Sequence, residues 1–545
     1  MPATSRPLVN KNPRVPSILD YFPPALQPRP QQVEALNFVE EAFNNGYRDV
    51  VIEAPTGAGK SILSATLCRW GRDQGTPEIL PGGYVLVVQK ALQDQMARDL
   101  DKLGGGKLTA ALLKGANEYP CPRFKACGNA VKGCSCRKQG TCPYVETKKI
   151  FLSSAIGVTN YAYYLTDAIY LQHLKTRAIM CCDEAHNLSK TLRSIVGMTI
   201  NQSDLEKRDP DLAQELPGLG TQLSDLLAWL QTRYLPVIYE RVLALTALAE
   251  EDGATVSISK MAFETRTEYL RVRSVAEDLE KDALGWVYWK EEARSGGTVL
   301  RCSPLNAGPF FEKYMGAFPR RVYLSAYVGR HEVFCQELGL DPKKVAIHRC
   351  ASTFPPENRP VILLNAGSLG KSSQFETLGP CLRITAKIAN HNKERGIIHA
   401  HSYDLAEKIA ASLRDAGLGG RLVYPLKAED RDAALEEHAN NPGSILLSPS
   451  IYEGYDFAGD LARWQVVVKC PYASLNDKVV STLAARDETW YELEALKCFL
   501  QAAGRIVRGE TDSGVTYVLD SDLGKLVRRY HSDLPLWFSG AIHER

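Results

Sequence analysis

Short runs of apolar residues recur along the chain, each bounded by glycine, proline or polar residues. In the first part of the chain they occupy residues 49–53, 84–88, 178–182 and 321–325. The stretches 31–43 and 60–72 carry apolar residues at helical spacing. Buried strands that alternate with helices are typical of an open parallel sheet. We therefore predict an α/β domain in the first part of the chain.

A second series of apolar runs indicates a second α/β domain. These runs lie at residues 361–364, 396–400, 444–448, 464–469 and 514–519. The region 188–300 differs, because it has long helical patterns at 221–234 and 236–250 and few strand signals. We expect a helical insert of the first domain there.

The composition is that of an ordinary globular protein of 545 residues, with 45% hydrophobic residues and a formal net charge of +2. The charge is uneven, because residues 102–149 hold ten Lys or Arg against two Glu, whereas residues 203–296 hold 18 acidic against 11 basic residues. Only the basic region suits a polyanion, and a solvated loop is its alternative interpretation. No stretch approaches the ~18 uncharged apolar residues that span a bilayer. Residues 1–19 lack the apolar core of a signal peptide, so we expect a cytoplasmic protein without membrane contact.

A phosphate-binding loop follows the first predicted strand and opens the next helix. Its residues are Ala54, Pro55, Thr56, Gly57, Ala58, Gly59, Lys60 and Ser61. The glycines let backbone N–H groups approach phosphates, and the N-terminus of the helix favours negative charge. We expect Lys60 to reach the β- and γ-phosphates of ATP and Ser61 to bind Mg²⁺.

An acidic motif follows the end of another predicted strand. It consists of Asp183, Glu184, Ala185 and His186. We expect Asp183 to hold Mg²⁺ and Glu184 to orient or deprotonate the attacking water. His186 is a candidate link between hydrolysis and another domain.

Positive charge for the transition state of phosphoryl transfer is expected from the second domain. The candidate motif contains Gln501, Arg505 and Arg508. The two arginines are three residues apart, so they share a face if they lie on a helix. An arginine supplied across a domain interface is a recurring part of phosphoryl-transfer enzymes.

Five cysteines cluster between the phosphate loop and the acidic motif. They are Cys121, Cys127, Cys134, Cys136 and Cys142. In a reducing cytosol, clustered thiols more often bind metal than form disulfides. Four thiolates suit either zinc or an iron–sulfur cluster. The spacing lacks the paired C-x2-C steps of many zinc sites, which favours iron and sulfur.

Together these motifs resemble those of superfamily 2 helicases, and the cysteine cluster narrows the resemblance to the XPD/DinG group of iron–sulfur DNA helicases. Further matching segments are residues 29–32, 92–95, 114–121, 142–144, 158–161 and 453–456. The resemblance spans about residues 20–525, and the segment 352–358 looks more like DinG-type bacterial or phage members. One departure is Tyr327, which stands where the group usually has Thr and puts a coupling contact in doubt.

The resemblance implies an α/β fold of two RecA-like parallel-sheet motor domains, with an iron–sulfur insert and a helical arch insert in the first. The first motor domain would comprise residues 1–110, 150–187 and 300–335. The cluster domain would comprise residues 111–149, the arch 188–299, and the second motor domain 336–545.

The resemblance also implies a [4Fe–4S] cluster beside ATP and Mg²⁺. The matching segments fix Cys121 and Cys142 as ligands, and Cys127 is the expected second ligand. Cys136 is the expected third, with Cys134 as the alternate, because these two are too close together to ligate one cluster comfortably.

Members of the group are ATP-dependent translocases that move 5′→3′ on single-stranded DNA and unwind duplexes. The implied partners are single-stranded and forked duplex DNA, with RNA–DNA hybrids as a further substrate, for a monomeric protein. Gln32 would recognise adenine and Arg29 help to position it, while Gly454 and Asp456 would sense both ATP and DNA. Tyr161 is a candidate for stacking on a base.

Two other functions are alternatives. One is a DNA-stimulated ATPase that remodels protein–DNA complexes or R-loops without processive unwinding. The other is a non-motor nucleic-acid-binding scaffold, for which Tyr327 is the only support.

Overall fold

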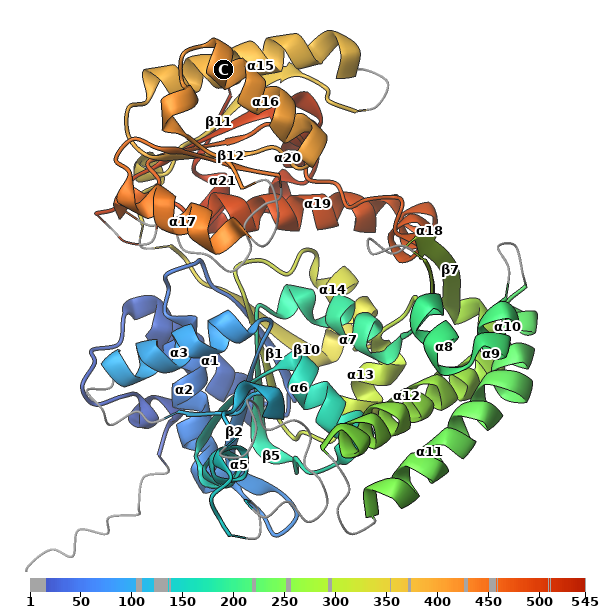
Figure 1. Cartoon of the computed structure of the whole chain (residues 1–545). Helices are drawn as coiled ribbons and strands as arrows, with labels where there is room; N and C mark the ends of the chain where they lie inside the picture. The colour runs from blue at the N-terminus through green and yellow to red at the C-terminus, as the bar shows by residue number, and fades with distance from the viewer. Residues whose placement is uncertain are drawn as a thin grey trace, which may run out of the picture.

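The computed structural model describes residues 16–103, 110–121, 136, 139–217, 222–250, 256–292, 297–352, 354–370, 374–425, 430–449, 457, 459–507, 509 and 511–544. Two α/β domains and an insert can be followed in Figure 1. Each α/β domain is built on a seven-stranded sheet, and the paired strands of both sheets run parallel. The predicted class, an α/β fold of two parallel-sheet domains, is therefore confirmed.

The first sheet gathers strands from distant parts of the chain. In spatial order its strands are β10 (Val345–Arg349), β1 (Asp49–Glu53), β9 (Arg321–Ser325), β5 (Arg177–Asp183), β2 (Leu80–Val87), β4 (Ile156–Asn160) and β3 (Ala111–Leu112). Its helices are α1 (Pro30–Asn44), α2 (Lys60–Trp70), α3 (Lys90–Leu103), α5 (Pro143–Ser153), α6 (Tyr161–Thr166), α13 (Gly308–Met315) and α14 (His331–Glu337). Fully buried runs such as β1 and β9 are the ones that the apolar pattern predicts.

The strand β10 extends the first sheet beyond the expected end of its domain. It pairs in parallel with β1, and its residues are mostly half-buried. The apolar run of this edge strand is only three residues long, 345–347, so the apolar pattern does not make it stand out. Because β11 of the second sheet starts at Val361, we propose that the boundary between the domains lies within residues 350–360 instead of at residue 336.

The insert is mainly helical, as expected, but it also contains a small antiparallel sheet. Its helices are α7 (Leu188–Val196), α8 (Gln202–Arg208), α9 (Pro210–Gln214), α10 (Leu223–Trp229), the π-helix η6 (Leu230–Tyr234), α11 (Leu235–Glu250) and α12 (Val256–Lys281). Its strands, in the order β6-β8-β7, are Met198–Asn201, Thr298–Pro304 and Trp286–Glu292. The helical pattern at 221–234 thus corresponds to α10 and η6 in succession.

The second sheet has the order β13-β14-β12-β15-β16-β11-β17. These strands are Leu422–Val423, Ile445–Ser448, Gly396–His399, Trp464–Val467, Val515–Asp520, Val361–Gly367 and Ile542–Glu544. Its helices are α15 (Gln374–His391), α16 (Tyr403–Asp415), α17 (Arg431–Asn440), α18 (Lys478–Arg486), α19 (Glu488–Ala503), α20 (Ser521–Arg529) and α21 (Leu536–Ser539). In Figure 1, α18 and α19 lie on the side of this domain that faces the first domain and the insert.

The sequence predicts no membrane-spanning segment, and the helices of the structure can be compared with that prediction. In the part of the chain that the structure describes, no helix combines the length and the apolar character needed to span a bilayer.

Candidate active site between the two domains

The phosphate loop connects the buried strand β1 to α2, and two of its glycines have left-handed backbone conformations. Gly57 has φ 83° and Gly59, the residue before α2, has φ 86°. A side chain at either position would be strained. Lys60 opens α2, and its Nζ lies 3.4 Å from the Ala54 carbonyl oxygen. Ser61 follows in the first turn, so both side chains that were expected at the phosphates start from the N-terminus of α2.

The segment before α1 packs directly on this loop. The Arg29 guanidinium donates to the Gly57 carbonyl oxygen at 2.9 Å, and Gln32 Nε2 donates to the Ala58 carbonyl oxygen at 3.1 Å. The Arg29 N–H in turn donates to Gln32 Oε1 at 3.0 Å. Both expected adenine-side residues therefore also hold the shape of the phosphate loop.

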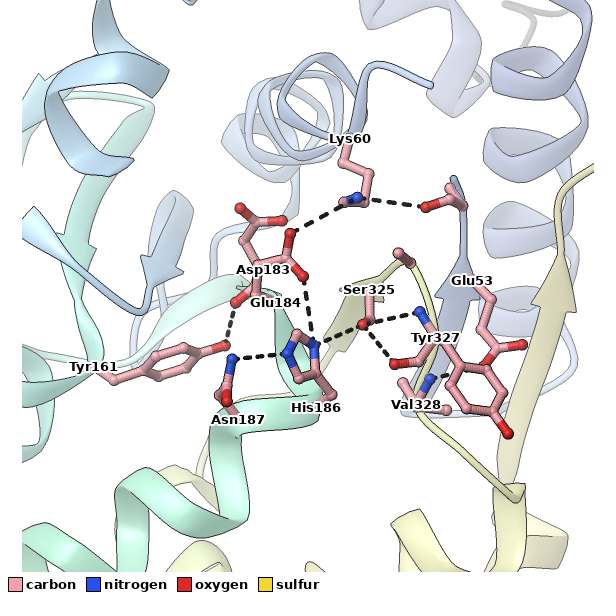
Figure 2. Close-up of polar contacts among 12 residues, drawn as sticks. Glu53, Lys60, Tyr161, Asp183, Glu184, His186, Asn187, Ser325, Tyr327 and Val328 are labelled. Carbon is pink, nitrogen blue, oxygen red and sulfur yellow. Dashed lines mark hydrogen bonds and ion pairs between the residues drawn. The ribbon is translucent and has the colours of Figure 1, made fainter. Parts of the chain in front are cut away.

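The acidic motif lies opposite the loop, at the end of β5 (Figure 2). Glu184 Oε1 lies 3.9 Å from Lys60 Nζ, and Glu184 itself has a left-handed backbone with φ 48°. The Asp183 Oδ1 atom is buried and has no hydrogen-bond partner among the described residues. Burial, followed by the charge of Glu184, raises the pKa of Asp183 to about 7. A buried carboxylate oxygen without a partner, beside a lysine and a phosphate loop, fits a Mg²⁺ ion held with a nucleotide.

His186 is in contact with three polar side chains. Its Nδ1 lies 2.9 Å from Ser325 Oγ and 3.4 Å from Glu184 Oε2, and its Nε2 lies 2.8 Å from Asn187 Nδ2 (Figure 2). The Asn187 amide donates, so Nε2 accepts and Nδ1 carries the proton in the neutral tautomer. Burial lowers the pKa of His186 to about 4, which keeps the ring neutral at physiological pH.

Ser325, and not residue 327, supplies the hydroxyl that contacts His186. The Ser325 hydroxyl donates to the Tyr327 carbonyl oxygen at 2.9 Å and accepts from the Tyr327 N–H at 3.2 Å. It thereby accepts the His186 Nδ1 proton without a hydroxyl at position 327. The Tyr327 ring is fully buried in a core cluster formed mainly by the second domain.

The arginine motif approaches the phosphate loop from the second domain. Gln501 lies in α19, and Arg505 follows in the turn that ends the helix. A Cβ atom on Gly504 would lie 3.1 Å from Thr56 Oγ1, so this turn touches the phosphate loop. A pocket between the domains is lined by Pro55 and Thr56 on one side and by Ala503, Gly504 and Val507 on the other.

Several predicted site residues lie outside the described residues. These are Cys127, Cys134, Gly454, Asp456 and Arg508. The other three candidate thiols belong to one cluster of the first domain, in which Cys136 and Cys142 are buried and Cys121 packs against it. Among the described residues no three His, Cys, Asp or Glu side chains are grouped closely enough to hold a single metal ion.

Other residues of the site were missed or misjudged from the sequence. Tyr161 is fully buried and its hydroxyl donates to the Asp183 carbonyl oxygen at 2.9 Å, so it is not a surface for base stacking. Glu53 at the end of β1 accepts from the Val328 N–H at 2.8 Å and from Arg349 at 2.9 Å. Glu53 could have been recognised from the sequence as a site residue, because it stands at the carboxyl end of a buried strand, just before the phosphate loop.

Comparisons with known proteins agree with this geometry. A family model described as helicase C-terminal domain matches residues 385–541, and one described as type III restriction enzyme, res subunit, matches residues 25–206. The ATP-dependent DNA helicase YoaA of Haemophilus influenzae is 22% identical over 92% of this chain and 92% of its own length. The ATP-dependent DNA helicase DinG of Photobacterium profundum is 24% identical over 44% of this chain and 37% of its own length.

Along most of its length the chain is thus similar to ATP-dependent DNA helicases of the XPD/DinG type. Two solved structures share its fold: an XPD helicase with a TM-score of 0.60 at 15% identity, and S. tokodaii Xpd4 with a TM-score of 0.56 at 14% identity. Each alignment covers 95% of this chain and all of the other. These structures have the same arrangement of two α/β domains, and we call the two seven-stranded domains of this chain the first and second motor domain.

Proposed function

We propose that this XPD/DinG-type protein is an ATP-dependent DNA helicase that translocates 5′→3′ on single-stranded DNA and unwinds duplexes. The observation that carries the proposal is the meeting of two motifs at one interface. The Lys60–Glu184 pair of the first motor domain faces the turn that bears Arg505 in the second. Such a site hydrolyses ATP when the domains close, and cycles of closure can move a strand.

Individual roles follow from the positions of the side chains. Lys60 and Ser61 would bind the phosphates and Mg²⁺, with Asp183 as the carboxylate ligand of the metal. Glu184 would orient the attacking water, and Arg505 would neutralise charge in the transition state. The scaffold alternative loses its support, because Ser325 supplies the hydroxyl partner of His186.

We also propose that the cysteine insert holds a [4Fe–4S] cluster with a structural role. Cys121, Cys136 and Cys142 lie in one packed cluster, which is compatible with a shared cofactor. Each cysteine of such a cluster binds a different iron, so its thiols lie farther apart than those around a single ion. The remaining partners, forked duplexes and RNA–DNA hybrids, the monomeric state and the cytoplasmic location are part of the same proposal.

An assay of ATP turnover and strand separation tests the function. We expect single-stranded DNA to stimulate hydrolysis, and a fluorescent fork with a 5′ overhang to be unwound in preference to one with a 3′ overhang. Lys60→Ala and Glu184→Gln should abolish the stimulated hydrolysis, because they remove the phosphate ligand and the water-orienting carboxylate. Stimulation without unwinding of either fork would favour the remodelling ATPase. Retained hydrolysis in either variant would refute the assigned roles.

A further inference from the structure

A buried ionic cluster joins the two motor domains. Its centre is Glu337, the last residue of α14 in the first domain, whose side chain is only 12% exposed. Lys497 of α19 in the second domain is 5% exposed, and its Nζ lies 3.9 Å from Glu337 Oε2. Lys497 also pairs with Glu494, one turn earlier on the same helix.

Three further side chains satisfy the other oxygen of Glu337. Its Oε1 accepts from Trp490 Nε1 of α19 at 3.0 Å and from Ser189 Oγ at 3.1 Å. Arg193 NH1 lies 3.5 Å from the same atom. Ser189 and Arg193 belong to α7, which begins two residues after His186. One carboxylate thus connects the helix that follows the acidic motif with the helix that carries the start of the arginine motif.

The charges of this cluster compensate one another. Burial alone would raise the pKa of Glu337, but Lys497 and Arg193 hold it below its ordinary value. Burial alone would lower the pKa of Lys497, but Glu494 and Glu337 raise it. Both groups are therefore charged. A buried ion pair of this kind contributes weakly to stability when complete, and it is costly when one partner is missing.

Lys497 is also placed to act on the active site. It precedes Gln501 by four residues on α19, so the two share a face of the helix. A Cβ atom on Gly329, in the loop that follows Ser325, would lie 3.6 Å from Lys497 Cε. The charges of Lys497 and Arg505 both contribute to the lowered pKa of His186, so both lie near the acidic motif.

We propose that Glu337 and Lys497 are positioning residues that hold α19 against the first motor domain, and so set the place of Arg505 at the nucleotide. The proposal rests on the proposed function of the site. It differs from the roles of Lys60, Glu184 and Arg505, because neither Glu337 nor Lys497 would touch ATP. The pair acts by keeping the turn that bears Arg505 at its position beside the phosphate loop.

The kinetic test compares four variants. Lys497→Met and Glu337→Gln should each lower the kcat of DNA-stimulated hydrolysis by about tenfold to a hundredfold, because small displacements of a catalytic group cost that much. The KM for ATP and the affinity for a fluorescent ATP analogue should change far less. The double variant should be no worse than the poorer single variant, since the two residues act as one unit. Lys497→Arg keeps the charge and should restore most of the rate.

A matched control and a readout without nucleotide complete the design. Lys525→Met removes a lysine that pairs with Asp522 on the exposed side of the second domain, and it should leave kcat unchanged. Hydrogen–deuterium exchange without ATP or DNA should rise in α7 and α19 of Glu337→Gln, and not in the two central sheets. If Lys497→Met does not fold, the test compares Glu337→Gln, which removes the carboxylate charge, with Glu337→Asp, which keeps it.

The outcomes separate the two proposals. Wild-type kcat in Lys497→Met, or additive losses in the double variant, would overturn the positioning role. Exchange that is unchanged in α7 and α19 would overturn it as well. A wild-type protein without DNA-stimulated hydrolysis would refute the proposed function, whereas the exchange experiment would still show whether the cluster holds α19.

Discussion

Replacing Ser325 by alanine should uncouple the acidic motif from the second motor domain. The Ser325 hydroxyl is the partner of His186 Nδ1 and also bonds the Tyr327 backbone through both its N–H and its carbonyl oxygen. The Tyr327 ring is buried mainly among second-domain residues, and Trp537 Nε1 of that domain donates to the Ala326 carbonyl oxygen at 3.3 Å. One hydroxyl therefore links His186 to a segment that is fixed to the other domain.

The size of the effect follows from the groups that lose their partner. Ser325→Ala leaves the His186 N–H and the Tyr327 carbonyl oxygen without the hydroxyl in a buried site. A buried group that is left unsatisfied costs about 1–3 kcal/mol. If one such penalty appears in the closed state that hydrolyses ATP, kcat should fall by about 5- to 150-fold. Nucleotide affinity should change little, because neither Lys60 nor Ser61 is affected.

The assay is DNA-stimulated ATP turnover measured together with unwinding of a fork. Tyr327→Phe is the matched control, because the Tyr327 hydroxyl is buried without a partner among the described residues. Its loss should leave both activities within about threefold of wild type, since no hydrogen bond within that part of the chain is lost. Wild-type turnover and unwinding in Ser325→Ala would refute the reasoning. A large loss in Tyr327→Phe would show that the tyrosine hydroxyl, and not Ser325, carries the coupling.

Two further predictions concern protonation and the cluster. The folded pKa of His186, about 4, lies below its ordinary value of about 6.5, so the unfolded chain binds the proton first and stability falls as the pH drops from 6.5 towards 4. In thermal melting between pH 5 and 7, the melting temperature of His186→Asn should fall less towards acid pH than that of the wild type. Equal losses in the two proteins would refute the assignment of this acid sensitivity to His186. Cys142→Ser should lower the iron content and the brown absorption near ~400 nm. Of Cys134→Ser and Cys136→Ser, only the variant that removes a ligand should do the same, and stoichiometric zinc in a colourless wild type would exclude the cluster.

Much of the fold could be predicted because its central strands are fully buried. A parallel sheet that is covered on both faces selects continuous apolar runs, and β1 and β9 are such runs. The helix that follows the phosphate loop begins at Lys60 because the glycine motif fixes its start. The antiparallel β7 and β8 were missed although β7 opens with the strand-favouring run at residues 286–289, because the whole region 188–300 was interpreted as helical.

The candidate site likewise combines residues that local sequence patterns predict with contacts that depend on long-range packing. Lys60, Asp183 and Glu184 could be predicted as neighbours because they lie at or after the ends of buried strands, and carboxyl ends of parallel strands meet at one edge of a sheet. Contacts between residues far apart in the chain gave no such signal. His186 and Ser325 are 139 residues apart, and Glu337 and Trp490 are 153 apart. Their meeting depends on the packing of whole domains, which apolar periodicity does not encode.

The segment from β9 to α14 explains why a tyrosine is acceptable at position 327. At its start Ser325 bonds His186, and at its end Glu337 binds the helix that precedes the arginine motif. Between them, Arg330 pairs with Asp533 of the second domain at 3.0 Å. The buried ring of Tyr327 adds apolar contact to this attachment, and the burial of its hydroxyl without a partner among the described residues offsets part of that gain. Position 327 therefore contributes to docking between the domains through a buried ring that packs mainly against second-domain residues.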